Sequence, residues 1–86
     1  METYTVKVTD DSVYPHETIE VVGDAMTEGE VFDYLLQFLG KDYREDGCAF
    51  EDEGEIWNCI YWARDTGSEN VLPWEYGKSI DILLND

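Results

Sequence analysis

The chain has 86 residues, of which 21 are acidic and 5 are basic, so its formal net charge at pH 7 is −16. This length accommodates a single domain, residues 1–86, and it excludes the core of a large enzyme. The charge disfavours direct contact with nucleic acid and with anionic membranes, because both repel an acidic surface. Hydrophobic residues nevertheless make up 43% of the chain and aromatic residues 14%, so we expect a folded domain and not an acidic disordered tail.

The sequence indicates a cytoplasmic protein. Its first residues contain neither the basic segment nor the apolar segment of a secretory signal. Its longest apolar stretch, 31–39, is far shorter than the roughly 20 residues that a membrane-spanning helix needs. We expect Cys48 and Cys59 to be free, mostly buried thiols, with a disulfide between them as the alternative.

Two strands are predicted in the first part of the chain. In residues 3–9, aromatic and β-branched residues alternate with polar ones, which is the pattern of a half-buried strand. A second run of strand-forming residues covers 18–22, and Gly23 is expected to end it. We expect these two strands to pair as a hairpin.

A helix is predicted over about residues 28–39. Thr27 and Glu30 have the spacing of a capping box, in which a hydroxyl and a glutamate each accept a hydrogen bond from a backbone N–H of the first turn. Apolar residues then recur every three or four positions from Val31 to Leu39, which gives one wide apolar face. Such a helix can cover one face of a small sheet.

The second half contains two apolar runs, 48–50 and 56–63, on either side of an acidic segment. The second run is rich in strand-forming residues, so we predict a second hairpin. A buried helix over 55–64 stays open as the alternative, because a short continuous apolar run does not reveal its type by periodicity. Residues 65–68 are expected to form a turn and 79–84 a final strand. The order ββαβββ predicts an α+β domain with a small, mainly antiparallel sheet and one α-helix packed on one face.

No constellation of residues indicates catalysis, and we expect a non-enzymatic protein without a cofactor. His16 is the single histidine and the only candidate general base, and it follows Pro15 in a predicted loop. Carboxylates are so numerous that a pair of them indicates nothing specific. A catalytic pair also needs a deep cleft that raises one pKa, and a domain of this size has little volume for one.

Residues 42–53 resemble the calcium-binding loop of EF-hand proteins. Acidic residues occupy the first and fifth positions of the loop, Gly47 the sixth and Glu53 the twelfth. The third position is Arg44, a cation where the loop needs a ligand oxygen, and Phe50 at the ninth position offers no ligand. We therefore predict no metal site and keep divalent-ion binding as an alternative function.

The acidic residues are unevenly distributed along the chain. No Lys or Arg occurs between Lys7 and Lys41, and acids are dense again over 42–55. Acids two apart on a strand are separated by about 6.7 Å, and acids three or four apart on a helix by about 5–6 Å. A duplex presents one phosphate charge per roughly 3.4 Å of its axis on each strand. Rows of carboxylates can therefore imitate rows of phosphates.

The chain also has more aromatic residues than one small core can hide, and Tyr and Trp are favoured at the centres of protein interfaces. We predict an acidic partner-binding surface with aromatic anchors. Its predicted members are Asp10, Asp11, Glu17, Glu20, Asp42, Glu45, Asp46, Glu51, Asp52, Glu53, Glu55, Tyr43 and Trp74. The expected partner is a basic nucleic-acid-binding protein, such as a nuclease or a CRISPR or restriction effector, bound without direct contact to nucleic acid or membrane.

This small, acidic, aromatic and cytoplasmic profile resembles the DNA-mimic inhibitors that phages and mobile elements make against restriction, CRISPR or repair enzymes. The resemblance is one of overall character and involves no shared motif. It implies a non-enzymatic inhibitor that blocks the basic DNA- or RNA-binding groove of its target. The alternative is an acidic protein-interaction or assembly module that binds through exposed aromatic side chains.

Overall fold

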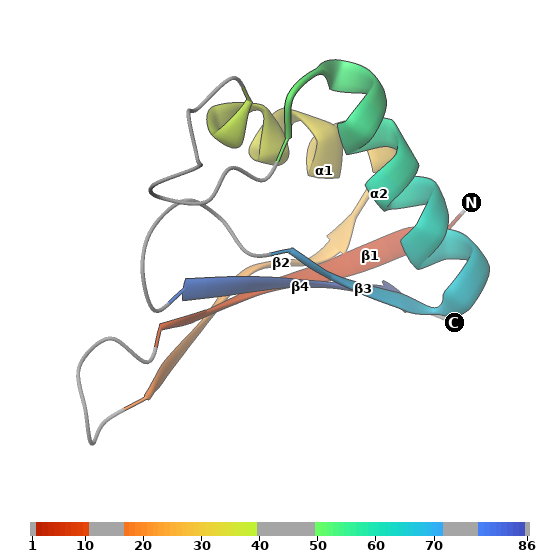
Figure 1. Ribbon diagram of the computed structural model, residues 1–86. Helices are drawn as coiled ribbons and strands as arrows, with labels where there is room; N and C mark the ends of the chain where they lie inside the picture. Colours follow the sequence, from red (N-terminus) through yellow and green to blue (C-terminus); the bar gives the residue numbers. More distant parts are fainter. Residues whose placement is uncertain (1, 11–16, 40–49, 72–77, 86) are drawn as a thin grey trace.

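The structure is a computed structural model of the chain, and it describes residues 2–10, 17–39, 50–71 and 78–85. These residues form an antiparallel sheet in the order β2-β1-β4-β3, with the helices on one face of it (Figure 1). The elements are β1 (Thr3–Asp10), β2 (Thr18–Met26), α1 (Glu28–Leu35), the 3-10 helix η1 (Leu36–Phe38), α2 (Glu53–Thr66), β3 (Ser68–Val71) and β4 (Lys78–Asn85). This arrangement confirms the predicted α+β class with a mainly antiparallel sheet.

The central strands β1 and β4 supply most of the core on the sheet side. Tyr4 and Val6 of β1 are fully buried, as is Ile82, which lies opposite Val6 on β4. Because side chains alternate along a strand, Thr5 and Lys7 are directed to the opposite face, which the helices leave uncovered (Figure 1). The strands predicted over 3–9 and 79–84 are confirmed.

β2 pairs with β1 as predicted but continues past its expected end, as far as Met26. Its pairing shifts register between Tyr4 and Val6 and again between Val6 and Lys7. At Gly23, an added Cβ would lie 2.6 Å from the Cγ of Met26. The prediction that Gly23 ends the strand is therefore wrong, because this glycine makes room for the side chain of Met26 at an irregular point of the sheet.

The capping box predicted for the first helix is present at the start of α1. Thr27 Oγ1 accepts a hydrogen bond from the Glu30 N–H at 3.2 Å, and the Thr27 N–H donates to Glu30 Oε1 at 3.0 Å. Val31 and Leu35 of α1 are fully buried, as expected for its apolar face. The helix predicted over 28–39 is confirmed in position, although its last turn, η1, tightens to 3-10 geometry.

The prediction of a hairpin is wrong for residues 56–63, which lie in α2. Asp52 caps this helix by accepting a hydrogen bond from the Glu55 N–H at 3.0 Å, and Gly67 ends it with φ 97°. These end signals, together with a buried stripe at helical spacing, outweigh the strand propensity of the individual residues. The stripe consists of Ile56, Cys59, Ile60 and Ala63.

The alternative of a helix over 55–64 is therefore the correct one, and the predicted turn at 65–68 is instead the end of α2 followed by the start of β3. Of the predicted strand over 48–50, residues 48 and 49 lie outside the described residues. Phe50 is described, and it forms an isolated parallel bridge with Leu39. The observed order of the described elements is ββααββ, with η1 following the first helix.

The core lies between the helices and the sheet. It consists of Tyr4, Val6, Val31, Leu35, Phe38, Phe50, Ile56, Cys59, Ile60, Ala63, Val71, Ile80 and Ile82. Cys59 is a free, buried thiol, as predicted, whereas Cys48 lies outside the described residues. Among the described helices, none is long and apolar enough to span a membrane.

Candidate partner-binding surface

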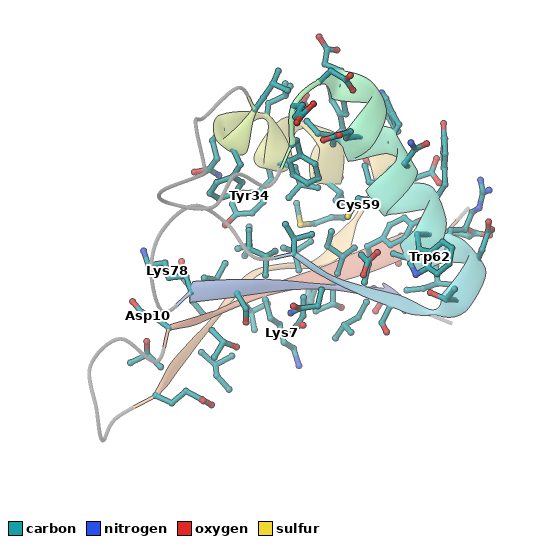
Figure 2. The ribbon with its side chains drawn as sticks, viewed as in Figure 1. Lys7, Asp10, Tyr34, Cys59, Trp62 and Lys78 are labelled. Carbon is teal, nitrogen blue, oxygen red and sulfur yellow. The ribbon has the colours of Figure 1, made fainter. Side chains whose placement is uncertain are left out.

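The first group of predicted binding residues lies at one end of the β1–β2 hairpin. Asp10 is the last residue of β1, Glu17 directly precedes β2, and Glu20 is an exposed residue within β2. Figure 1 shows this end of the hairpin projecting beyond the helices, and Figure 2 marks Asp10 there. We call Asp10, Glu17 and Glu20 the hairpin acids.

The second group surrounds the start of α2 and consists of Glu51, Asp52, Glu53 and Glu55, which we call the helix-cap acids. All four are exposed. Two of them have structural roles, since Asp52 Oδ1 accepts from the Glu55 N–H and Glu55 Oε2 accepts from the Glu51 N–H at 2.7 Å. Among the described residues, Glu51 and Glu53 have no hydrogen-bond donor at their carboxylates. Their charge is stabilised by the N-terminal end of the helix dipole and stays available to a partner.

The hairpin acids and the helix-cap acids do not meet on one face. The projecting end of the hairpin lies at the lower left of Figure 1, beyond the helices, whereas α2 begins at the top of the helical layer. The structure therefore presents two separate acidic surfaces in its described parts, a point that the sequence had left open. The remaining predicted members, Asp11, Asp42, Tyr43, Glu45, Asp46 and Trp74, lie outside the described residues.

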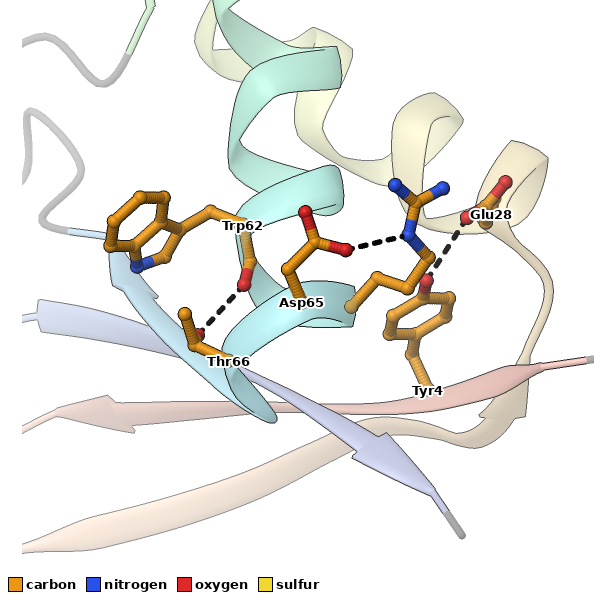
Figure 3. Close-up of polar contacts among 6 residues, drawn as sticks. Tyr4, Glu28, Trp62, Asp65 and Thr66 are labelled. Atoms are coloured by element: carbon orange, nitrogen blue, oxygen red, sulfur yellow. Dashed lines mark hydrogen bonds and ion pairs between the residues drawn. The ribbon is translucent and has the colours of Figure 1, made fainter.

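An aromatic column joins the two helices. Phe32 of α1 stacks on Trp57 of α2 with ring centroids 4.6 Å apart, and Trp57 is followed by Tyr61 at 5.8 Å. The guanidinium of Arg64 continues the column, with Cζ 4.8 Å from the centroid of Tyr61. Its Nε donates to Asp65 Oδ1 at 3.1 Å (Figure 3). The guanidinium of Arg64 is thus bound jointly by an aromatic face and by a carboxylate.

Trp62 is the most exposed aromatic side chain in the described residues, with 59% of its surface accessible. It lies on the side of α2 that is nearest β3 (Figure 2). There it lines a shallow surface groove of about 350 Å³, which we call the Trp62 groove. The groove is lined by Phe50, Glu55, Asn58, Cys59, Trp62 and Glu69.

Both walls of the Trp62 groove follow from the secondary structure. Glu55, Asn58 and Trp62 are spaced three and four residues apart on α2, so their side chains lie along one side of the helix. Glu69 of β3 is opposite the buried Ile82 of β4, so it is directed to the side of the sheet that the helices cover. The result is an indole with a carboxylate on each wall.

Trp62 is one of the aromatic residues that the sequence offers as possible anchors, but the predicted members of the binding surface did not include it. In a strand over 56–63, position 62 would share a face with Ile56 and Ile60, which are core residues. In a helix, position 62 falls beside the buried stripe and points outward. The cap residue Asp52 and the glycine at position 67 are the sequence signals that favour a helix here, and with it an exposed indole.

Two buried groups in the described residues are neutral at pH 7. Burial raises the pKa of the Cys59 thiol to about 12, and the negative charge of Glu69 acts in the same direction. The hydroxyl of Tyr4 donates to Glu28 Oε2 at 3.0 Å (Figure 3), and burial, followed by this hydrogen bond, raises the pKa of Tyr4. A thiol nucleophile must be deprotonated to react, so Cys59 is a packing residue and not a reactive one.

The calcium-like segment 42–53 is described only from residue 50 onward, and His16 also lies outside the described residues. In the described part of the chain, no three His, Cys, Asp or Glu side chains are grouped as metal ligands. Asp52, which falls within the segment, is engaged in capping α2. The calcium alternative therefore stays a prediction.

Comparison of the chain with protein-family models, with curated proteins and with solved structures found no match. The described surface offers a partner two groups of acidic side chains and a groove with an exposed indole. Each of these features suits a positively charged ligand.

Proposed function

We propose that this protein is a small acidic, non-enzymatic inhibitor that acts in the cytoplasm. It mimics nucleic acid and occupies the basic groove of a nucleic-acid-binding protein, in the manner of the inhibitors that phages and mobile elements direct against CRISPR or restriction enzymes. The observation that carries the proposal is the negative charge exposed on the surface of the domain. The net charge is −16, and no acidic side chain in the described residues is buried. Self-repulsion at this density destabilises a small domain, and a basic partner would offset that cost.

The dimensions of the domain support the same proposal. Its principal extents are 38 × 29 × 19 Å. A length of 38 Å corresponds to about eleven phosphates of one strand, at one phosphate per about 3.4 Å of helix axis. The hairpin acids and the helix-cap acids, which lie apart, would then contact separate parts of one long basic groove.

The first test is the salt dependence of partner binding. The tagged protein is used to isolate its partner from a lysate of the host at low salt, and the purified pair is then titrated at increasing salt. We expect the affinity to fall at least about tenfold between 50 and 500 mM salt, and duplex DNA or RNA to displace the protein from its partner. An affinity that does not change with salt, or a ternary complex with nucleic acid, would contradict the proposal.

The second test locates the contact by reversing exposed acidic side chains whose carboxylates accept no hydrogen bond within the described residues. One variant combines Glu17→Lys with Glu20→Lys, and another combines Glu51→Lys with Glu53→Lys, which leaves the cap residue Asp52 intact. The matched control combines Asp24→Lys with Asp33→Lys, two exposed acids outside both groups. We expect each of the first two variants to lose at least tenfold more affinity than the control. Equal losses in all three variants would exclude the predicted surface.

A second candidate function, an acidic interaction module that binds through aromatic residues, is favoured by the exposure of Tyr61 and Trp62, at 40% and 59%. This function predicts that reversing the hairpin acids and the helix-cap acids changes affinity little. It also predicts that the affinity is insensitive to salt, because burial of aromatic surface is not screened by ions. The two tests above therefore separate the candidates.

A further inference from the structure

The Trp62 groove combines two kinds of chemistry that recognise a cation. The exposed indole of Trp62 offers an aromatic face, and Glu55 and Glu69 place a carboxylate on each wall. Glu55 Oε2 and Glu69 Oε1 accept backbone hydrogen bonds, from Glu51 and from Asn70 respectively, which orients both carboxylates. The second oxygen of each carboxylate accepts no hydrogen bond within the described part of the chain, so each retains acceptor capacity for a ligand.

The aromatic column shows how this protein holds a guanidinium. Arg64 lies over the ring of Tyr61 at 4.8 Å while its Nε donates to Asp65 Oδ1 at 3.1 Å. On the other side of the same helix, the Trp62 groove provides an aromatic face and carboxylates, but none of the described Lys or Arg side chains lines it. The groove therefore has the same two binding groups as the Arg64 site, without an internal cation between them.

We propose that the Trp62 groove binds an arginine side chain of the basic partner. This inference rests on the proposed function and deepens it, because it names one anchor of the interface and the residue type that the anchor accepts. Its volume of about 350 Å³ is at the lower end of the roughly 300–1,000 Å³ of small-molecule sites, so it fits a single side chain. A planar guanidinium stacks on an indole and also binds a carboxylate, which a lysine ammonium does less well.

The experiment compares two probes of equal charge, hexa-arginine and hexa-lysine, by NMR titration of the ¹⁵N-labelled protein. The indole N–H signal of Trp62 is assigned by its loss in the Trp62→Phe variant. We expect this signal to shift and saturate with hexa-arginine, at an affinity about two- to fivefold higher than for hexa-lysine, the range of an exposed cation–π contact. A Trp62 signal that does not move would overturn the proposal.

The ratio of the two affinities provides the sharper readout, because general attraction to an acidic protein acts on both probes alike. In Trp62→Ala the ratio should fall to about one, and Glu69→Gln should reduce it as well. The matched control is Asp33→Asn, which removes the same charge from an exposed position on α1 and should leave the ratio unchanged. A ratio that Trp62→Ala does not alter, or that Asp33→Asn alters equally, would contradict the groove as the site.

Failure of this inference can be distinguished from failure of the proposed function. If Trp62→Ala binds the isolated partner as tightly as the unmodified protein and keeps the steep salt dependence, the groove is excluded and nucleic-acid mimicry remains. If the groove selects arginine while nucleic acid fails to displace the protein from its partner, the groove remains and mimicry is excluded.

Discussion

Cys59 shows how the interior of this acidic domain controls the protonation of one group. The thiol is 9% exposed, and burial raises its pKa from 9.0 to about 12. As the pH rises, the unfolded chain therefore releases this proton before the folded chain does. The stability that comes from the neutral thiol is complete below pH 9.0 and is lost as the pH rises toward about 12.

This difference in pKa predicts both reactivity and pH dependence. In a Cys48→Ser variant, we expect iodoacetamide to modify Cys59 at pH 8 far more slowly in the folded protein than in urea, since the thiolate is the reactive form. Between pH 8 and pH 11, the free energy of unfolding should fall more in this variant than in the matched control Cys48→Ser with Cys59→Ala. If the free energy of unfolding, measured in urea, depends on pH identically in the two proteins, the raised pKa of Cys59 is refuted.

Among the secondary-structure elements, α2 depends most clearly on its ends. Asp52 accepts from the Glu55 N–H at 3.0 Å, and the side chain that caps the helix is also one of the helix-cap acids. We expect Asp52→Ala to lower the free energy of unfolding by about 1 kcal/mol, a typical loss for a removed N-cap. Asp52→Asn removes the same charge but keeps the acceptor, so it should cost only a few tenths of a kcal/mol. Equal effects of the two substitutions in urea unfolding would mean that charge, and not the cap, is responsible.

The elements also differ in how far the sequence predicts them. β1 alternates apolar and polar residues, β4 is rich in strand-forming residues, and α1 begins at a capping box, so a local pattern is sufficient for each. Residues 56–63 carry strand-forming side chains in a continuous apolar run, which fits the period of a strand and that of a helix equally. Their type is decided by Ile56, Ile60 and Ala63 packing as one helical stripe against the sheet, which is a tertiary contact.

At the scale of the whole molecule, a net charge of −16 is confined within a longest extent of 38 Å. The Debye length is about 30 Å at 0.01 M salt and falls below about 10 Å above 0.1 M. At low salt, most of the acidic side chains therefore repel one another, and added salt screens this repulsion. The folded state, which holds the charges closer together than the unfolded chain does, benefits more from the screening.

We therefore predict that NaCl stabilises this protein. Raising NaCl from 10 to 500 mM should raise the thermal midpoint measured by calorimetry, and each 1 kcal/mol of relieved repulsion corresponds to about 4–8 °C for a domain of this size. The variant with Glu17→Lys and Glu20→Lys has a smaller net charge and should show a smaller rise. A midpoint that falls with NaCl would mean that ion pairs, and not self-repulsion, dominate the electrostatics of the fold.

By itself, the sequence determined the sign and size of the charge, because net charge is a sum over residues and needs no structure. It also predicted the elements whose periodicity is unambiguous. Only the tertiary structure decided that 56–63 is helical, that Trp62 is exposed beside Glu69, and that the described acids form two separate surfaces. Each of these depends on which segments pack together across the chain, and packing between distant segments is not a property of any local pattern.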